Sequence, residues 1–168
     1  MDNLLSLSLE DACIKGNLKK VKELVGIGAD INQTLCEGKT AICWSVSGGH
    51  YDLTKYLVDE GANVNFQEED EGESVLIFAL QDLDGEGMVL MMKLLLDSGA
   101  LVDQPDFLGW TPLIHATSYI SFEAVEVLLK YHANPDFRVS DQNDSALTIC
   151  EDEGIKALLL SSQKLSEA

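Results

Sequence analysis

The sequence has few basic residues. Among its 168 residues, 11 are lysine or arginine and 29 are aspartate or glutamate, which gives a formal net charge of −18. A protein that binds nucleic acid by itself needs a cationic surface to displace counterions, and docking onto an anionic membrane makes the same demand. The scarcity of positive charge therefore excludes both classes and favours a basic partner.

Long apolar segments are also missing. The strongest apolar run, residues 88–96, is interrupted by Lys93 and falls far short of the roughly 20 residues that span a bilayer. The first ten residues carry Asp2 where a signal peptide carries a base. Apolar residues still make up 46% of the chain, which is enough to build a core. We therefore expect a folded, cytoplasmic protein.

Motifs for catalysis or metal binding are absent as well. The spacings of zinc proteases, serine hydrolases and EF-hands do not occur. The Gly-Lys-Thr at residues 38–40 lacks the glycine of a P-loop, because Gln33 stands five positions before Gly38. The cysteines form no Cys-x-x-Cys pair, so we expect free buried thiols at Cys13, Cys36, Cys43 and Cys150. The sequence predicts a protein that is not an enzyme, with no cofactor and no metal.

What the sequence does contain is a repeat. Four segments with a helical pattern are each followed by a Gly-Ala or His-Ala pair. The pairs begin at Gly28, Gly61, Gly99 and His132, so that successive pairs are 33, 38 and 33 residues apart. Ahead of the helices stands a second motif, fullest at residues 109–116 as Gly-Trp-Thr-Pro-Leu-Ile-His-Ala, with weaker copies at 38–45 and 72–79. A period near 33 is that of ankyrin repeats, and the chain resembles an ankyrin-repeat array over nearly its whole length.

Elementary physical chemistry explains the motifs. Hydroxyl side chains stand where helices begin and can accept bonds from free N–H groups; they are Thr40, Ser74, Thr111 and Ser145. The glycines follow a helix, where a left-handed conformation is needed. No repeat can bury its apolar face alone, so neighbours must stack. The resemblance implies an all-α repeat solenoid of about five units, each with two helices and a β-finger.

We divide the chain, as a single ankyrin-repeat domain over residues 1–168, into five units. They are an N-terminal capping repeat at residues 4–34, a second repeat at 35–67, a third at 68–104, a fourth at 105–138 and a C-terminal capping repeat at 139–168.

Two units depart from the family pattern. The third has four extra residues, which we place in the turn between its helices at residues 81–87, and one more before Gly72. In the fourth, Ile120 and His132 replace glycines of the pattern, which predicts local distortion. His50 matches the structural histidine of the family, which implies a hydrogen-bonding role in a turn.

Acidic residues are concentrated in the middle of the array. Residues 59–106 hold 13 acids and one base, Lys93, and five of the acids fall within residues 68–73, at the finger-tip of the third unit. Lysines cluster instead in the first unit, between residues 15 and 22. Such a run is either an ordinary solvated face or a surface that steers a basic partner, and both interpretations stay open.

The resemblance implies a contact surface, because ankyrin arrays bind proteins through finger-tips and inner-helix surfaces. By register, the candidate partner-binding residues are Glu37, Lys39, Asp70, Glu71, Glu73, Gln81, Asp82, Phe107, Trp110 and Tyr119. We expect the last three to be partly exposed, since interfaces favour aromatic anchors. We expect Trp44 and Phe78 to lie mostly in the core.

The function predicted is a non-enzymatic protein–protein interaction module, monomeric when free, that binds a basic protein through an acidic concave face and its finger-tips. Two alternatives remain. The first is an inhibitor of the immunity or antitoxin type that covers a cationic active site, for example that of a nuclease toxin. The second is a general regulatory adaptor.

Overall fold

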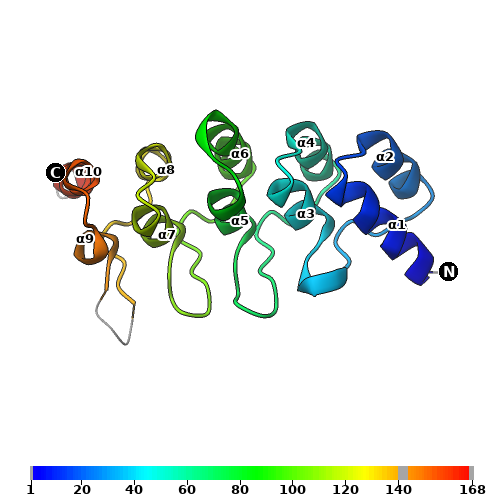
Figure 1. The fold of residues 1–168 in the computed structure, drawn as a ribbon, viewed down its shortest axis with the longest axis horizontal. Coiled ribbons are helices and arrows are strands. Elements are labelled where there is room, and N and C mark those ends of the chain that lie inside the picture. The colour runs from blue at the N-terminus through cyan, green and yellow to red at the C-terminus, as the bar shows by residue number, and fades with distance from the viewer. Residues whose placement is uncertain (1, 140–143, 167–168) are drawn as a thin grey trace.

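The computed structural model describes residues 2–139 and 144–166, with side chains at 4–139 and 144–162. Its helices form two rows, and loops project from the inner row on the side away from the outer row (Figure 1). The inner row consists of α1 (Asp2–Ile14), α3 (Ala41–Ser47), α5 (Val75–Asp82), α7 (Pro112–Ser118) and α9 (Ala146–Ile149). The outer row consists of α2 (Leu18–Gly26), α4 (Tyr51–Asp59), α6 (Gly85–Asp97), α8 (Phe122–Lys130) and α10 (Glu153–Ser166). The all-α repeat fold is confirmed.

The loops are short fingers, each closed by a backbone hydrogen bond. We name them finger A (residues 35–39, with the 3-10 turn Cys36–Gly38), finger B (67–74), finger C (105–110) and finger D (138–145). In finger B the Glu68 N–H donates to the carbonyl of Glu73 at 3.1 Å, and in finger C the Asp106 N–H donates to that of Trp110 at 3.0 Å. Residues 140–143 of finger D lie outside the described residues.

Three of the four predicted helix caps are confirmed. The hydroxyls of Ser74, Thr111 and Ser145 accept hydrogen bonds from backbone N–H groups three residues later. Thr40 is the exception: its hydroxyl makes no cap bond and lies 3.4 Å from the Cys43 Sγ instead. The Thr40 hydroxyl is therefore paired with a thiol rather than with a backbone N–H group, and either atom can be the donor.

The turns after the outer helices have the predicted left-handed conformation. Gly28, Gly61 and Gly99 have φ values of +97°, +89° and +91°. Where the pattern loses glycine, the backbone path is kept rather than changed, because Ile120 has φ +56° and His132 has φ +66°. The fourth unit therefore holds two side chains in a region that costs an L-residue about 1–2 kcal/mol.

The predicted position of the insertion is wrong. Residues 81–87 do not form an enlarged turn, because α5 runs to Asp82 and α6 begins at Gly85. Instead α6 has 13 residues where α4 and α8 have 9, so the four extra residues add about one helical turn. The buried residues of α6 explain this, since Met88, Met91, Met92, Leu95 and Leu96 lie at helical spacing on one face.

Neighbouring units are joined by side-chain bridges. Asn32 donates from Nδ2 to the Gly61 carbonyl at 3.1 Å and accepts at Oδ1 from the Asn63 N–H at 2.8 Å. Asn65 makes the same pair of bonds to Gly99 and Leu101, one unit further along. We call these contacts the asparagine bridges.

His50 joins the first two units in a second way. Its Nε2 lies 2.9 Å from the carbonyl oxygen of Ile14, so that nitrogen donates, and the structural role expected for His50 is confirmed. A single core runs through the stack, from Leu9 in α1 to Leu159 in α10. Among the described residues, no helix combines the length and the apolar character that a membrane crossing requires.

Candidate protein-binding surface

The acids of finger B do not all face solvent. The side chain of Glu68 is buried, with 5% exposure. Its carboxylate accepts hydrogen bonds from three backbone N–H groups, those of Asp70 (2.7 Å), Glu73 (3.1 Å) and Glu71. Burial alone would raise the pKa of Glu68, but the backbone donors outweigh it and hold that pKa below its ordinary value. Glu68 therefore shapes the finger, so neither interpretation of the acidic run applies to it.

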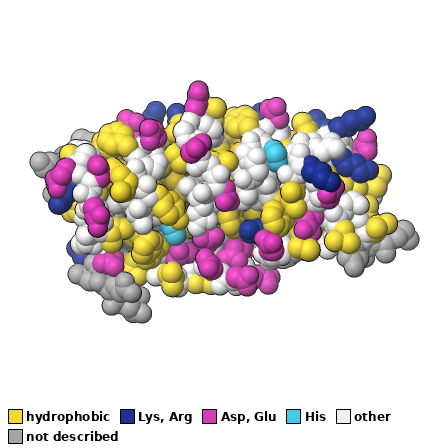
Figure 2. All heavy atoms as spheres, viewed as in Figure 1, with side chains coloured by type: hydrophobic (Ala, Val, Ile, Leu, Met, Phe, Trp, Pro, Cys, Tyr) yellow, Lys and Arg dark blue, Asp and Glu magenta, His cyan; other side chains and the backbone are white. Residues whose placement is uncertain are grey.

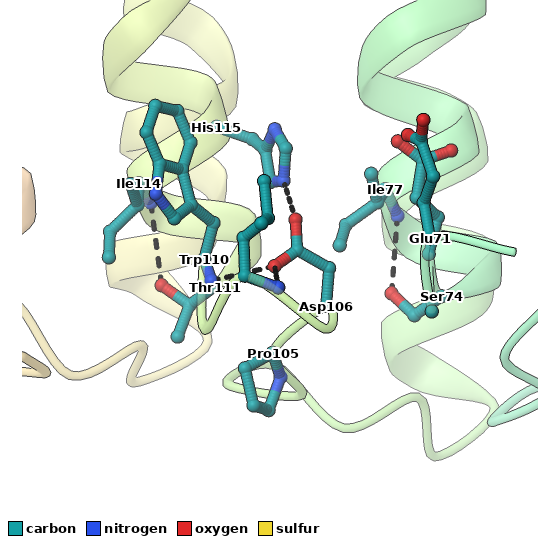
Figure 3. Close-up of polar contacts among 12 residues, drawn as sticks. Glu71, Ser74, Ile77, Pro105, Asp106, Trp110, Thr111, Ile114 and His115 are labelled. Atoms are coloured by element: carbon teal, nitrogen blue, oxygen red, sulfur yellow. Dashed lines mark hydrogen bonds and ion pairs between the residues drawn. The ribbon is translucent and has the colours of Figure 1, made fainter. Parts of the chain in front are cut away.

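Asp106 has the same role in finger C. Its Oδ1 accepts from the N–H groups of Leu108 and Trp110 at 2.9 and 2.8 Å, and its Oδ2 lies 2.8 Å from His115 Nε2 (Figure 3). Glu68 precedes the glycine of its finger by one residue more than Asp106 does. The longer glutamate side chain therefore closes the longer finger.

Four of the five acids of finger B, all except Glu69, line a groove against finger A. The groove has a volume of about 280 Å³, and we call it the acidic groove; its lining residues are Glu37, Lys39, Glu68, Asp70, Glu71, Glu73 and Phe78. In Figure 2 the Asp and Glu side chains gather along the lower middle of the molecule, where these fingers lie. The structure thus brings together five of the ten predicted contact residues, from two fingers of different units.

Glu73 is the most constrained of the candidate carboxylates. Its Oε1 accepts a hydrogen bond from the Nε2 of Gln81, which places Gln81 against the acidic groove. Burial raises the pKa of Glu73, and repulsion from Glu71 and Glu68 adds to the rise, although Gln81 and His115 oppose it. Asp82 is exposed at the C-terminal end of α5. The groove therefore carries more negative charge than its own cations balance.

A lysine lies over two aromatic rings in this groove. The Nζ of Lys39 is 4.8 Å from the ring centroid of Trp44 on α3 and 5.1 Å from that of Phe78 on α5. It also lies 3.5 Å from the carboxylate of Glu37. Phe78 is buried, as expected, and Trp44 is partly buried.

An aromatic cluster adjoins the groove at finger C. The ring of Trp110 lies 5.4 Å from that of His115, which lies 5.8 Å from that of Tyr119. Phe107 is 66% exposed and Tyr119 47% exposed, while Trp110 is partly buried. The exposure predicted for these aromatic side chains is therefore confirmed. We call Phe107, Trp110 and Tyr119 the aromatic cluster.

A backbone hydrogen bond joins finger B, which lines the acidic groove, to finger C, which carries Phe107 and Trp110 of the aromatic cluster. The Phe107 N–H donates to the Glu71 carbonyl at 2.9 Å, so fingers B and C are joined by backbone. The Phe107 ring packs so closely on Gly72 that a Cβ there would lie 2.3 Å from it. This close packing requires glycine, which also has φ +73°.

The cysteines follow expectation at three of four positions. Cys13, Cys43 and Cys150 are buried, and burial raises the pKa of Cys13 to about 12. Cys36 was expected to be buried but is exposed, because it lies in the turn of finger A. Across residues 2–139 and 144–166, no group of three or more His, Cys, Asp or Glu residues is arranged to hold a metal ion.

Several structural residues were missed by sequence reasoning. They are Glu68, Asp106 and His115 on the finger side, and the asparagine bridges between units. A signal for the two acids did exist, since each stands three or four residues before the glycine of its finger. Nothing of that kind marks the position of Lys39 over two rings, since the rings come from different units.

The comparisons with known proteins point to one family. The family model described as ankyrin repeats (3 copies) matches residues 9–106 and 67–141. A putative ankyrin repeat protein of Rickettsia bellii is 30% identical over 125 residues, which are 71% of this chain and 34% of that protein. The putative ankyrin repeat protein YahD of Escherichia coli is 28% identical over 158 residues, which are 74% of this chain and 79% of that protein.

A yeast relative matches most of the chain. The probable 26S proteasome regulatory subunit p28 of Saccharomyces cerevisiae is 28% identical over 153 residues, covering 89% of this chain and 64% of that protein. The chain thus spans about a third of the Rickettsia protein, at 34%, and somewhat under two thirds of the yeast one. Since the family model matches well over half of its residues, the chain belongs to the ankyrin-repeat family.

Proposed function

We propose that this chain is a protein-binding module that recognises a basic protein partner through the acidic groove and the aromatic cluster. Ankyrin repeats generally mediate protein–protein interaction. The observation that carries the choice of partner is the groove itself, in which several carboxylates line one cavity beside exposed aromatic rings.

Electrostatics supports a basic partner. Glu37, Asp70, Glu71 and Glu73 line the groove together with one cation, Lys39. The raised pKa of Glu73 reflects burial and the repulsion of neighbouring acids, and an incoming cation would offset that repulsion. The lysines near the N-terminus lie at the far upper corner of the molecule, away from the groove (Figure 2). The attraction between the acidic groove and a basic partner would also raise the rate at which the two proteins associate.

The aromatic cluster supplies the apolar part of the contact. Hot spots at interfaces are enriched in tryptophan and tyrosine, usually ringed by polar residues that exclude water. Here the rings of Trp110 and Tyr119 both lie against His115, and Phe107 is bonded to finger B through its backbone. The partner surface that fits is therefore basic with an apolar centre.

A capture experiment tests the proposal. The chain is immobilised and exposed to native lysate at low and high salt, beside the double variant Glu71→Gln with Glu73→Gln. A matched control is Glu123→Gln with Glu126→Gln, which removes equal charge from exposed positions of α8. We expect a basic partner that is lost at high salt and with the first variant but kept with the control. Acidic partners, or binding that salt does not change, would contradict the proposal.

A more specific form of the proposal is an inhibitor. An acidic surface concentrated at mid-array is suited to covering the cationic active site of an enzyme, as an immunity protein does. The test is the activity of the captured partner: if it is a nuclease, its rate should fall in proportion to the complex formed. Unchanged activity in the saturated complex would favour a regulatory adaptor.

The proposal includes a monomer that acts in the cytoplasm. All four cysteines are free, which suits a compartment where thiols stay reduced. The net charge of −18 makes copies of the chain repel one another. Sedimentation equilibrium at physiological salt should therefore give a mass near 18.3 kDa, and a dimer mass would contradict this part.

A further inference from the structure

The acidic groove already holds a cation, supplied by the chain itself. The Lys39 ammonium lies over the Trp44 and Phe78 rings at 4.8 and 5.1 Å, with the Glu37 carboxylate 3.5 Å away. The side chain of Lys39 is 21% exposed, so this part of the groove is largely sheltered from solvent. Two aromatic faces with carboxylates around them form a pocket whose chemistry is that of a cation receptor.

We propose that this pocket receives one arginine side chain of the partner, and that Lys39 is an internal occupant which the arginine displaces. The inference rests on the proposed function, since it assigns one contact within the acidic groove. It adds a regulatory element, because the affinity of the groove for cations is reduced by a competitor that belongs to the chain.

The Lys39 side chain is placed so that its ammonium group can move out of the acidic groove. It is anchored through the backbone of finger A, which makes the closing bond from the Leu35 N–H to the Lys39 carbonyl at 2.7 Å. Its side chain has one ion pair, to Glu37, whose side chain is 67% exposed. An exposed pair of this kind is weak, so breaking it leaves the fold intact, and an arriving arginine would replace the contacts of the ammonium with the two rings.

Arginine suits the pocket better than lysine does. Its guanidinium is planar and weakly hydrated, stacks on aromatic faces, and binds two carboxylate oxygens at once. The groove offers both features, because Phe78 lines it together with carboxylates of finger B, and the ring of Trp44 lies under the same ammonium group of Lys39. Lys39 can satisfy the rings and Glu37, but Asp70 and Glu71 retain their charge for a second, forked donor.

The position of Lys39 recurs along the array. The residue directly before the N-cap residue of an inner helix is Lys39 for α3, Glu73 for α5 and Trp110 for α7. Trp44, Phe78 and His115 recur in the same way on α3, α5 and α7. In the fourth unit Trp110 lies against His115, as Lys39 lies over Trp44 in the second. Fingers A and C thus each lay one side chain on an inner-helix ring, and at the acidic groove that side chain is cationic.

The test uses the full chain, labelled with ¹⁵N, and a capped tri-arginine peptide as the probe. The chain has two tryptophans, so the indole N–H signal of Trp44 is assigned with a Trp110→Phe variant. The variant that tests displacement is Lys39→Ala. The matched control is Lys55→Ala, which removes the same charge from an exposed position on α4 that pairs with Asp59.

We expect the peptide to shift the Trp44 indole signal and to bind Lys39→Ala about three- to tenfold more tightly than the wild-type chain. A three- to tenfold change corresponds to about 0.6–1.4 kcal/mol, which suits the removal of a competing cation from two rings and one exposed carboxylate. Lys55→Ala should bind no more than twofold differently from wild type. A tri-lysine peptide should bind more weakly than tri-arginine to Lys39→Ala.

Two outcomes would overturn the inference: no shift at Trp44 on saturation, or Lys39→Ala binding no more tightly than Lys55→Ala. Lys39→Gln, which removes the charge but keeps most of the length of the side chain, replaces the alanine variant if that variant loses the circular dichroism signal of its helices. The failure of the proposed function is distinguishable, because it would appear as the absence of a basic partner in the capture experiment while the peptide still displaced Lys39.

Discussion

At the scale of single residues, two carboxylates that look alike in the sequence have opposite roles. Glu68 and Glu71 belong to one acidic run, yet the Glu68 side chain is buried and accepts bonds from backbone N–H groups, whereas Glu71 is exposed. Asp106 repeats the role of Glu68 in the next finger. Since a buried carboxylate is stable only when its oxygens are paired, these two acids determine finger shape rather than affinity.

Substitution of Glu68 should therefore cost stability. Glu68→Gln exchanges an acceptor oxygen for an NH₂ group facing backbone donors, so the free energy of unfolding in urea should fall by about 1–3 kcal/mol. Glu69→Gln, at the exposed neighbouring position, should change it by under about 0.5 kcal/mol. Equal losses in the two variants would show that the bonds to Glu68 contribute nothing.

The same residue predicts a pH dependence. The pKa of Glu68 is lowered in the folded state, so its stabilisation is present above the ordinary glutamate pKa and is lost as the pH falls through the lowered value. Urea unfolding of the wild type between pH 7 and pH 3 should show this loss, and the Glu68→Gln profile should be flatter. Parallel profiles for the two proteins would contradict the assignment.

His132, one of the non-glycine residues in the left-handed region, gives a prediction of the opposite sign. His132→Gly should raise the free energy of unfolding by up to about 1 kcal/mol, because it removes a conformational cost of about 1–2 kcal/mol and adds about 0.5–1 of backbone entropy. The reciprocal control is Gly99→Ala, which should lower stability. Thermal unfolding of both variants is the measurement, and a loss of stability in His132→Gly would exclude strain there.

At the scale of elements, the asparagine bridges determine how one unit is attached to the next. Asn65→Ala removes the bonds to Gly99 and Leu101 together and should cost about 1–3 kcal/mol. Asn65→Asp keeps the acceptor for the Leu101 N–H but loses the donor to Gly99, so its stability should lie between the other two. Hydrogen exchange should speed most at the junction of the second and third units. An Asn65→Asp variant no better than Asn65→Ala would refute this division.

Much of the fold could be predicted from the sequence because its signals are local. The hydroxyls of Ser74 and Thr111 and the glycine after each outer helix act within a few residues of their own position. The insertion was misplaced because Gly85 and Gly87 disfavour a helix by about 1 kcal/mol each. The burial of Met88 and Met91 overrides that cost, and burial depends on the neighbouring units.

The candidate site was less predictable for a related reason. Register alone identified finger-tip residues, and the structure places Asp70, Glu71 and Glu73 together with Lys39 in the acidic groove. The burial of Glu68 depends on how finger B closes, and the contact of Lys39 with two rings depends on how units stack. Neither the burial of Glu68 nor the contact of Lys39 with the rings can be predicted from the spacing of residues within one repeat.

At the scale of the whole molecule, the excess charge opposes compactness. With a net charge of −18, self-repulsion should be screened by salt, so the Tm should rise by several degrees between 20 and 500 mM sodium chloride. The double variant Glu71→Gln with Glu73→Gln should show a smaller rise, because it relieves the densest part of the charge. A Tm that falls with salt would mean that attractive ion pairs dominate instead.

The extra turn of α6 has a consequence for how such arrays change over time. Four residues were added to the outer row, while on the opposite side fingers B and C are joined by the bond from the Phe107 N–H to the Glu71 carbonyl (Figure 1). The outer row can therefore accept an insertion in a helix without a change in the fingers that form the proposed binding surface. The same property makes the start of α6 a natural graft point for an epitope or a fluorophore, which would report on binding without touching the groove.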